Sequence, residues 1–357
     1  PKTMSGIWLT GHGDVDRLEA RHDIPVPRPG PTDVLVQVAA AGVNNTDINT
    51  RTAWYSKGNQ DGDDASWAGA PIVFPRIQGI DACGRIAAVG DAIDPSRIGE
   101  RVLVEPCLLE ADGQELAKPW FLGSECDGAF AEYLVVASRH ACKIDSALSD
   151  IELASFPCSY STAENMLTKS QVSGGDRVLV TGASGGVGSA AVQLAVARGA
   201  QVFAVTTPEK GPDLITLGAA QTLTRDDPVV EVLGADSLDV VVDLVAGPRW
   251  PELLDVLRPG GRYAVAGAVA GPLVELDIRT LYLKDLSFFG CTVLEPEVFA
   301  NLIDLIETGR IAPVVAATFP LEEIAQAQAL FQSKKHTGKI VLAVDAQARA
   351  SLSETDG

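Results

Sequence analysis

The sequence has no closely spaced cysteine pair and no long apolar run. Its six cysteines lie far apart, which argues against a zinc ribbon or a CxxC redox pair. No uncharged stretch of about 18 apolar residues occurs, so we predict no membrane-spanning helix. Residues 1–13 lack the charged-then-apolar layout of a secretion signal. We therefore expect free, mostly buried thiols and a cytoplasmic location.

Basic residues are fewer than acidic ones, 28 against 47, which gives a formal net charge of −19. Because no run of Lys or Arg interrupts this acidity, we expect neither nucleic acid nor an anionic membrane as a partner. A phosphate-bearing ligand would have to be held by backbone amides and a few local cations. The 357 residues, 46% of them hydrophobic, suffice for two domains with sizeable cores.

Two patterns of predicted secondary structure divide the chain. Up to about residue 150, short segments broken by Gly and Pro predict a β-rich barrel or sandwich. From Arg177 onward, β-α-β alternation predicts a doubly wound parallel sheet. The predicted strands are 33–38, 81–90, 101–104, 129–136, 177–180, 202–205, 238–244, 263–266, 286–289 and 339–344. Helices are predicted at 186–198, 251–257, 297–308 and 321–333, with a frayed polar tail from 345.

A glycine-rich turn joins the first strand of the alternation to its helix, and residues 181–188 read T-G-A-S-G-G-V-G. Gly182 permits a tight turn, and Gly188 lets the helix pack closely on the strand. Gly185 and Gly186 let the backbone approach a pyrophosphate, to which the helix N-terminus offers free amides. The motif in this context predicts a dinucleotide site. A glycine turn without a ligand is the alternative.

The end of the second strand favours NADPH over NADH. An NAD site usually has an acidic residue there, which bonds the ribose hydroxyls and repels a 2′-phosphate. Thr206, Thr207 and Lys210 suit a 2′-phosphate better, whereas Glu209 suits it only if it points to solvent. A solvated loop lysine is the alternative for Lys210. The residues expected to bind NADP(H) are Gly182, Ala183, Ser184, Gly185, Gly186, Val187, Gly188, Thr206, Thr207, Lys210 and Gly267.

Six further segments follow one another in a fixed order: Gly42–Asn49 (GVNNTDIN), Gly79–Ile86 (GIDACGRI), Gly99–Val102 (GERV), Gly128–Tyr133 (GAFAEY), Arg258–Arg262 (RPGGR) and His336–Leu342 (HTGKIVL). With the glycine motif they resemble the medium-chain dehydrogenase/reductase superfamily, in particular its quinone-oxidoreductase-like and enoyl-reductase-like branches. The resemblance spans about residues 33–344. It implies a GroES-like catalytic domain of residues 1–157 and 292–357, a Rossmann domain of residues 158–291, and homodimers or homotetramers.

The resemblance also indicates where zinc would bind. The catalytic zinc of the superfamily's alcohol dehydrogenases is held by Cys, His and Cys, and the matching positions here are Asn44, Ile80 and Cys158. Isoleucine has no donor atom, and asparagine is a poor zinc ligand. The structural zinc of those enzymes needs four cysteines in one lobe, which here holds only Cys107 and Cys126. We therefore expect no metal.

Without a metal, hydrogen-bond donors must stabilise the developing oxyanion or enolate. Asn44 and Asn49 offer amides, and Thr46 matches the hydroxyl proton relay of the zinc enzymes. Tyr55 stands eleven residues after Asn44, the spacing at which the similar enoyl reductases place their proton-donating tyrosine. A phenol with an ordinary pKa of about 10 is a proton donor at neutral pH. An aromatic anchor is the alternative for Tyr55.

Two neighbouring features have supporting roles in this interpretation. We expect Asp47 to bond nearby backbone amides or an arginine such as Arg51. Residues 54–75 are polar but contain four aromatic side chains, so they either fold over a site or form a surface insertion.

These observations predict an enzyme that reduces a quinone or an α,β-unsaturated carbonyl compound with NADPH and without zinc. An alcohol dehydrogenase or aldehyde reductase that uses a metal is the first alternative. A non-catalytic nucleotide-binding protein, like the crystallin relatives of the superfamily, is the second. In the first two cases the partner is a small carbonyl or quinone molecule.

Overall fold

The computed structural model describes residues 1–57 and 64–355, with the backbone alone for 351–355. The chain forms two compact units, one of residues 1–158 and 313–357, the other of residues 159–312. The predicted division had placed 292–312 with the catalytic domain. In the structure this segment, with helix α9 (Val298–Glu307), is tied to the second unit. Asn165 Nδ2 donates to the Val293 carbonyl (3.0 Å), and the Ala312 amide donates to Gln193 Oε1 (2.9 Å).

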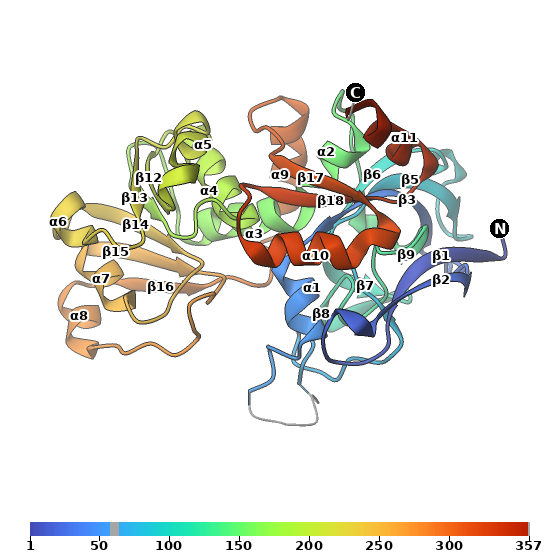
Figure 1. Cartoon of the computed structure of the whole chain (residues 1–357), viewed down its shortest axis with the longest axis horizontal. Helices are drawn as coiled ribbons and strands as arrows, with labels where there is room; N and C mark the ends of the chain where they lie inside the picture. The colour runs from blue at the N-terminus through green and yellow to red at the C-terminus, as the bar shows by residue number, and fades with distance from the viewer. Residues whose placement is uncertain (58–63, 356–357) are drawn as a thin grey trace. The chain divides into compact units, whose positions relative to one another are not determined.

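The second unit is built on a six-stranded sheet in the order β13-β12-β11-β14-β15-β16, with every neighbouring pair parallel. Its strands are β11 (Arg177–Val180), β12 (Gln201–Thr206), β13 (Gln221–Thr224), β14 (Leu238–Asp243), β15 (Leu257–Val265) and β16 (Ser287–Gly290) (Figure 1). This order confirms the predicted doubly wound sheet. The strand order reverses between β11 and β14, which is where such sheets bind nucleotides.

Helices connect these strands, and the central strands are buried on both faces, as is usual for a parallel sheet that is covered by helices. A core of aliphatic side chains, with Phe203, Trp250 and Tyr263, packs between the sheet and the helices. The remaining elements of the second unit are α3 (Pro157–Lys169), which begins in the first unit, α4 (Gly186–Ala197), η4 (Pro208–Lys210), α5 (Gly211–Thr216), α6 (Val229–Leu233), α7 (Trp250–Asp255) and α8 (Ile278–Leu283) (Figure 1).

The first unit is β-rich, as predicted, and β3 (Asp33–Val43) is its central strand. A seven-stranded sheet has the order β10-β6-β5-β3-β18-β17, with β9 also paired to β3; a second sheet has the order β2-β1-β4, and β7 and β8 form a hairpin. The other strands are β1 (Thr3–Leu9), β2 (Leu18–Pro25), β4 (Arg76–Ile77), β5 (Cys83–Val89), β6 (Arg101–Val104), β7 (Cys107–Ala111), β8 (Gln114–Phe121), β9 (Tyr133–Ala137), β10 (Ala141–Lys143), β17 (Val315–Pro320) and β18 (Lys339–Ala343).

Short helices complete the first unit. They are η1 (Val15–Arg17), α1 (Asn45–Arg51), η2 (Pro95–Arg97), η3 (Ser138–His140), α2 (Asp150–Leu153), η5 (Leu321–Glu323), α10 (Ile324–Ser333) and α11 (Ala346–Thr355) (Figure 1). The prediction of a frayed tail was wrong, because α11 forms there and Asp345 caps it by accepting from the Ala348 amide (2.7 Å). None of the six cysteines forms a disulfide. Among the described residues, no helix has both the length and the apolar character needed to span a membrane.

Candidate functional site

The glycine turn after β11 has the backbone that the sequence predicted. Gly182 has φ of 58°, in the left-handed region. A Cβ on Gly188 would lie 2.2 Å from the Gly182 carbonyl oxygen, so only glycine fits where the helix meets the turn. Gly185 is the N-cap of α4 and has no side chain to bond the first amides. The turn therefore fits a pyrophosphate, which these amides would bind at the positive end of a 12-residue helix.

The carboxyl end of β12 carries the residues expected at the adenosine ribose. Thr206 is buried, and its Oγ1 has no hydrogen-bond partner among the described residues. Lys210 Nζ lies 3.5 Å from Ser184 Oγ in the glycine turn. Glu209 is exposed, and a hydrogen bond from its own backbone amide, together with the Thr207 hydroxyl, holds the pKa of its carboxyl below the usual range. The acidic residue that conflicted with NADPH is therefore in solvent.

A second cation, Arg225, stands beside Lys210. It follows β13, the strand next to β12, so both side chains come from the same edge of the sheet. Burial lowers the pKa of Lys210, and the positive charge of Arg225 lowers it further. The sequence interpretation missed Arg225, because it did not predict β13, the strand that Arg225 follows. Gly267, which follows β15, has no room for a Cβ against the Leu244 carbonyl oxygen (2.8 Å).

In the first unit, Asn44 caps helix α1 and joins a buried ionic network. Asn44 Nδ2 donates to Asp81 Oδ2 (2.8 Å), and Lys339 Nζ donates to both Asn44 Oδ1 (2.5 Å) and Asp81 Oδ2 (2.9 Å). The other carboxylate oxygen of Asp81 accepts from the Cys158 amide (2.6 Å). Both polar atoms of the Asn44 side chain are thus engaged inside the protein. Asn44 fits a positioning role better than that of a direct donor to substrate.

Asp47, in the first turn of α1, contacts the residue that caps the same helix. Its Oδ2 accepts from the Asn44 amide (2.8 Å), as expected for a carboxylate that bonds nearby backbone. Arg51, the alternative partner, instead donates to the Gly13 carbonyl (2.7 Å) and to Gln328 Oε1 (3.1 Å). Burial raises the pKa of Asp47 to about 7, with a smaller contribution from the negative charge of Asp81.

Tyr55, Thr46 and Asn49 come together at the end of α1. Thr46 and Asn49 lie one turn apart on the helix and face the Tyr55 phenol. Burial raises the pKa of Tyr55 above its ordinary value, and the two polar side chains only partly oppose this. The phenol therefore stays protonated throughout the neutral range and is suited to give a proton to an oxyanion or enolate. Residues 58–63 of the segment 54–75, which we expect either to fold over a site or to form a surface insertion, lie outside the described residues.

Comparison with known proteins identifies the family. Residues 30–146 match the alcohol dehydrogenase GroES-like domain, and residues 217–342 match the family described as zinc-binding dehydrogenase. A solved structure of a putative alcohol dehydrogenase from Sinorhizobium meliloti 1021 is 44% identical, with a TM-score of 0.90 over 97% of this chain and 98% of that one. The chain belongs to the medium-chain dehydrogenase/reductase superfamily. The resemblance seen in the sequence is confirmed.

Two relatives of this dehydrogenase/reductase have named activities. Quinone oxidoreductase of Homo sapiens is 28% identical over 355 residues, which cover 96% of this chain and 98% of the relative. Acryloyl-coenzyme A reductase of Metallosphaera sedula is 29% identical over 349 residues, which cover 95% and 99%. Membership of the superfamily makes the chain an oxidoreductase that uses a nicotinamide cofactor.

The residues of this dehydrogenase/reductase do not fit the zinc that one family description names. The Asn44 oxygen already faces the Lys339 ammonium group, whose positive charge would repel a metal cation. Ile80 is buried and has no donor atom, which leaves Cys158 as a single thiol. Nowhere in residues 1–57 and 64–355 do three His, Cys, Asp or Glu side chains gather so that they could hold a metal ion.

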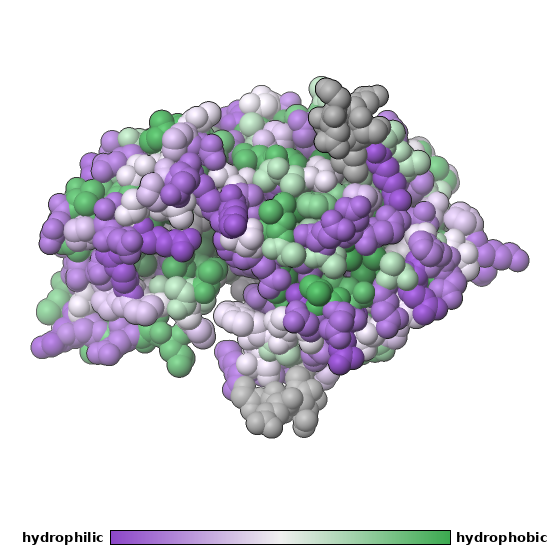
Figure 2. All heavy atoms as spheres, viewed as in Figure 1, coloured by the Kyte–Doolittle hydropathy of each residue, from purple (hydrophilic) through white to green (hydrophobic). Residues whose placement is uncertain are grey.

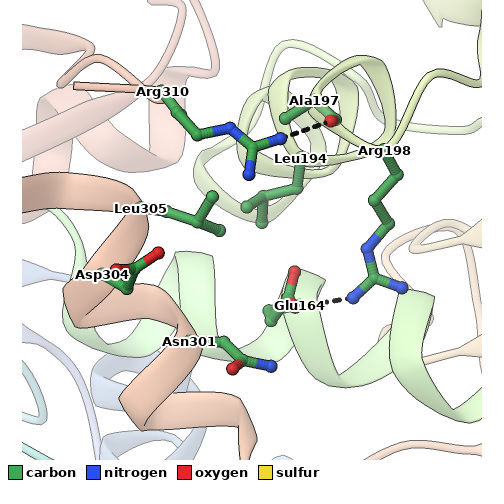
Figure 3. Close-up of a pocket in the computed structure, with 8 residues that line it drawn as sticks. All are labelled: Glu164, Leu194, Ala197, Arg198, Asn301, Asp304, Leu305 and Arg310. Atoms are coloured by element: carbon green, nitrogen blue, oxygen red, sulfur yellow. Dashed lines mark hydrogen bonds and ion pairs between the residues drawn. The ribbon is translucent and has the colours of Figure 1, made fainter. Parts of the chain in front are cut away.

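The second unit also contains a pocket of about 290 Å³ between α3, α4 and α9 (Figure 3). An ion pair between Arg198 and Glu164 (2.6 Å) lies on one side, and Arg310 donates to the Ala197 carbonyl (2.7 Å) on the other. Its lining residues are Glu164, Leu194, Ala197, Arg198, Asn301, Asp304, Leu305 and Arg310. It contains none of the predicted site residues, and its arginines already have protein partners.

Proposed function

We propose that this protein reduces a quinone or an α,β-unsaturated carbonyl compound with NADPH and without zinc. One observation carries the proposal: Tyr55, a partly buried tyrosine whose pKa is raised, lies with Thr46 and Asn49 close in sequence to Asn44, one of the positions that do not fit a metal. The names of two relatives, quinone oxidoreductase and acryloyl-coenzyme A reductase, support the same class of electron-poor substrate.

In this proposal the protein holds the substrate oxygen and supplies the proton. The reduced nicotinamide, when bound, supplies the hydride. Tyr55 donates its phenolic proton to the enolate or oxyanion that hydride addition creates, and solvent then returns a proton to the phenolate. Thr46 and Asn49 orient the phenol and stabilise its anion in the interval. Asn44 keeps α1 in place through Asp81 and Lys339.

The preference for NADPH is proposed to rest on two cations. Lys210 and Arg225 would neutralise the 2′-phosphate, with the Thr206 and Thr207 hydroxyls beside them. We expect Lys210→Ala and Arg225→Ala each to raise KM for NADPH about tenfold or more and to leave KM for NADH nearly unchanged. Arg279→Ala, which removes an exposed cation of the same unit, is the control. Equal changes in the KM for NADPH and the KM for NADH would contradict the proposed contact of Lys210 and Arg225 with the 2′-phosphate.

The reaction is tested by following NADPH oxidation with a panel of quinones, enones, aldehydes and ketones. We expect turnover with the first two classes and no loss of activity after metal chelation. Tyr55→Phe should lower kcat about 100-fold or more, because only the proton donor is removed. Tyr133→Phe, which changes a partly buried tyrosine on β9, should have no such effect. A Tyr55→Phe variant with wild-type kcat would rule out the assigned donor.

Alcohol dehydrogenase activity is the second candidate, because the 44% identical structure carries that name. It predicts oxidation of alcohols with NADP⁺ and a stoichiometric transition metal in the purified protein. Metal analysis together with the substrate panel separates the two functions. Binding of NADPH without turnover of any class would instead favour a non-catalytic nucleotide-binding protein.

We further propose that the protein forms a homodimer through the edge of the second unit's sheet. The sheet ends at β16, an edge strand, and the neighbouring α8 exposes Ile278, Tyr282 and Leu283. Apolar surface is visible beside α8 in Figure 2. Exposed apolar side chains next to an open strand edge favour pairing with a second copy. Leu283→Lys should shift the mass measured by light scattering toward the monomer, whereas Lys118→Glu on β8 should not.

The cytoplasm is the proposed compartment. None of the six cysteines forms a disulfide, and four of them are buried. A reducing environment keeps such thiols in this state. Fractionation of cells that produce the protein at its natural level would test this proposal.

A further inference from the structure

Tyr55 is packed into a stack of aromatic rings. The Trp67 ring lies flat on Phe121, with centroids 4.3 Å apart and planes at 11°. Trp67 also stacks with the Tyr55 ring at 6.3 Å and 21°, and the Trp54 and Tyr55 rings meet edge to face at 5.4 Å and 78°. Stacked and edge-on rings at these distances attract each other beyond simple burial. The plane of the candidate proton donor is therefore defined by Trp67.

The backbone at Trp67 is held by the base of the β7–β8 hairpin. Its amide donates to Ser124 Oγ (3.0 Å), and the next amide, of Ala68, donates to Glu125 Oε1 (2.8 Å). The other carboxylate oxygen of Glu125 accepts from the Phe121 amide (2.7 Å). One carboxylate thus joins the segment that carries Trp67 to the strand that carries the ring beneath it. Hydrogen bonds to a charged acceptor are roughly twice as strong as neutral ones.

Two separate sets of contacts therefore determine the position of Tyr55. Thr46 and Asn49 of helix α1 lie next to the Tyr55 phenol. The helix ends at Arg51, and Ala53 has φ of 57°, so the chain reverses before it reaches Tyr55. This turn alone leaves the direction of the side chain open, because Tyr55 lies outside the helix. The ring of Trp67 supplies the missing constraint from the hairpin side.

We propose that Trp67 is a positioning residue for the proton donor Tyr55, and that Glu125 is the hub through which the β7–β8 hairpin sets this position. The inference rests on the proposed role of Tyr55. In the zinc dehydrogenases that the sequence resembles, four cysteines and a metal hold this lobe together. Here neither Cys107 nor Cys126 forms a disulfide, and Glu125 makes the connection with hydrogen bonds. The hairpin is thereby coupled to the reaction.

The test compares Trp67→Ala, Trp67→Phe and Glu125→Gln with the control Glu115→Gln, an exposed carboxylate on the same hairpin. Trp67→Ala should lower kcat about tenfold or more at unchanged KM for NADPH, because a misplaced donor slows the chemical step. Trp67→Phe keeps a ring on Phe121 and should restore most of the rate. Glu125→Gln should be intermediate, since its amide nitrogen cannot accept from a backbone amide. Glu115→Gln should match the wild type.

A titration separates positioning from general loss of stability. The absorbance of the Tyr55 phenolate is obtained by subtracting the Tyr55→Phe titration from that of each parent. Loss of the Trp67 ring exposes the phenol, so its pKa should fall toward the ordinary value in Trp67→Ala and remain raised in Trp67→Phe. A wild-type kcat in Trp67→Ala would overturn the proposal, as would equal losses of kcat in the Ala and Phe variants.

Different results would contradict the proposed function and the positioning role of Trp67 and Glu125. If Tyr55→Phe keeps the wild-type kcat, the proposed function loses its proton donor. If Tyr55→Phe is slow but Trp67→Ala and Glu125→Gln are as fast as the wild type, only the positioning role is wrong. Trp67→Phe and Glu125→Gln retain a similar shape, so they decide the question even if Trp67→Ala does not fold.

Discussion

The two units each bury an aspartate beside their candidate site, and they compensate its charge differently. In the first unit, Asp81 pairs with the ammonium group of Lys339 at 2.9 Å. In the second unit, Asp243 is equally buried but receives neutral donors, the hydroxyls of Thr181 and Tyr263, both at 2.6 Å. Two backbone amides of the turn after β14 donate to it as well. The first site thus adds an opposite charge to two neutral donors, Asn44 Nδ2 and the Cys158 amide, whereas the second site uses neutral donors alone.

The difference has consequences for how each site responds to change. Removing one partner of a buried ion pair leaves a charge in a medium of low polarity, which is strongly destabilising. A carboxylate that is shared among several neutral donors loses only one of them at a time. We therefore expect the first unit to depend on a few charged side chains. The second should tolerate single losses better, because its fixed backbone amides remain in place.

The largest effect is expected from Lys339→Met. It leaves Asp81 buried without its cation, and the free energy of unfolding should fall by about 3–5 kcal/mol. Denaturant unfolding monitored by circular dichroism measures the loss. Lys335→Met, an exposed lysine of the same segment, should stay within about 0.5 kcal/mol of the wild type. Adding Asp81→Asn to Lys339→Met should recover part of the loss, and no recovery would contradict the ion-pair account.

The next effect concerns pH, through the raised pKa of Asp47. Its carboxyl binds a proton up to about pH 7 in the folded chain but only to about pH 4 when unfolded. The folded state therefore holds more protons across this window, and stability falls as the pH rises. Between pH 5 and pH 8 the wild type should lose roughly 2–3 kcal/mol more than Asp47→Asn. Denaturant unfolding at several pH values measures this difference in the free energy of unfolding.

The control for the pH effect is Asp91→Asn, an exposed aspartate of the same unit. Its stability curve should run parallel to that of the wild type. A wild-type curve that is flat between pH 5 and pH 8 relative to Asp47→Asn would mean that Asp47 is already charged in the folded protein. In that case Lys339 would neutralise two carboxylates instead of one.

The comparison also explains what the sequence could and could not predict. The strand at 177–180 and the helix from Gly186 were predicted correctly, because local periodicity and glycine backbone preferences specify them. The network around Asn44 joins side chains 295 residues apart in the chain, and no local pattern contains that pairing. The hydrogen bond from the Ala68 amide to Glu125 joins residues 57 positions apart and could not be predicted for the same reason. Features that depend on a single segment could be predicted from the sequence, whereas networks assembled from several segments could not.

The smallest effect is expected in the second unit, where neutral donors surround Asp243. Tyr263→Phe removes one donor to Asp243 and the acceptor of the Trp250 indole N–H (2.8 Å), while Thr181 and the backbone amides remain. The free energy of unfolding should fall by about 1–3 kcal/mol, less than in Lys339→Met. The exposed Tyr282→Phe should change it by no more than about 0.5 kcal/mol. If Tyr263→Phe lowered the free energy of unfolding as much as Lys339→Met, the comparison would be wrong. The Tyr263 phenol alone would then stabilise the buried Asp243 carboxylate, and the remaining neutral donors would not compensate for its loss.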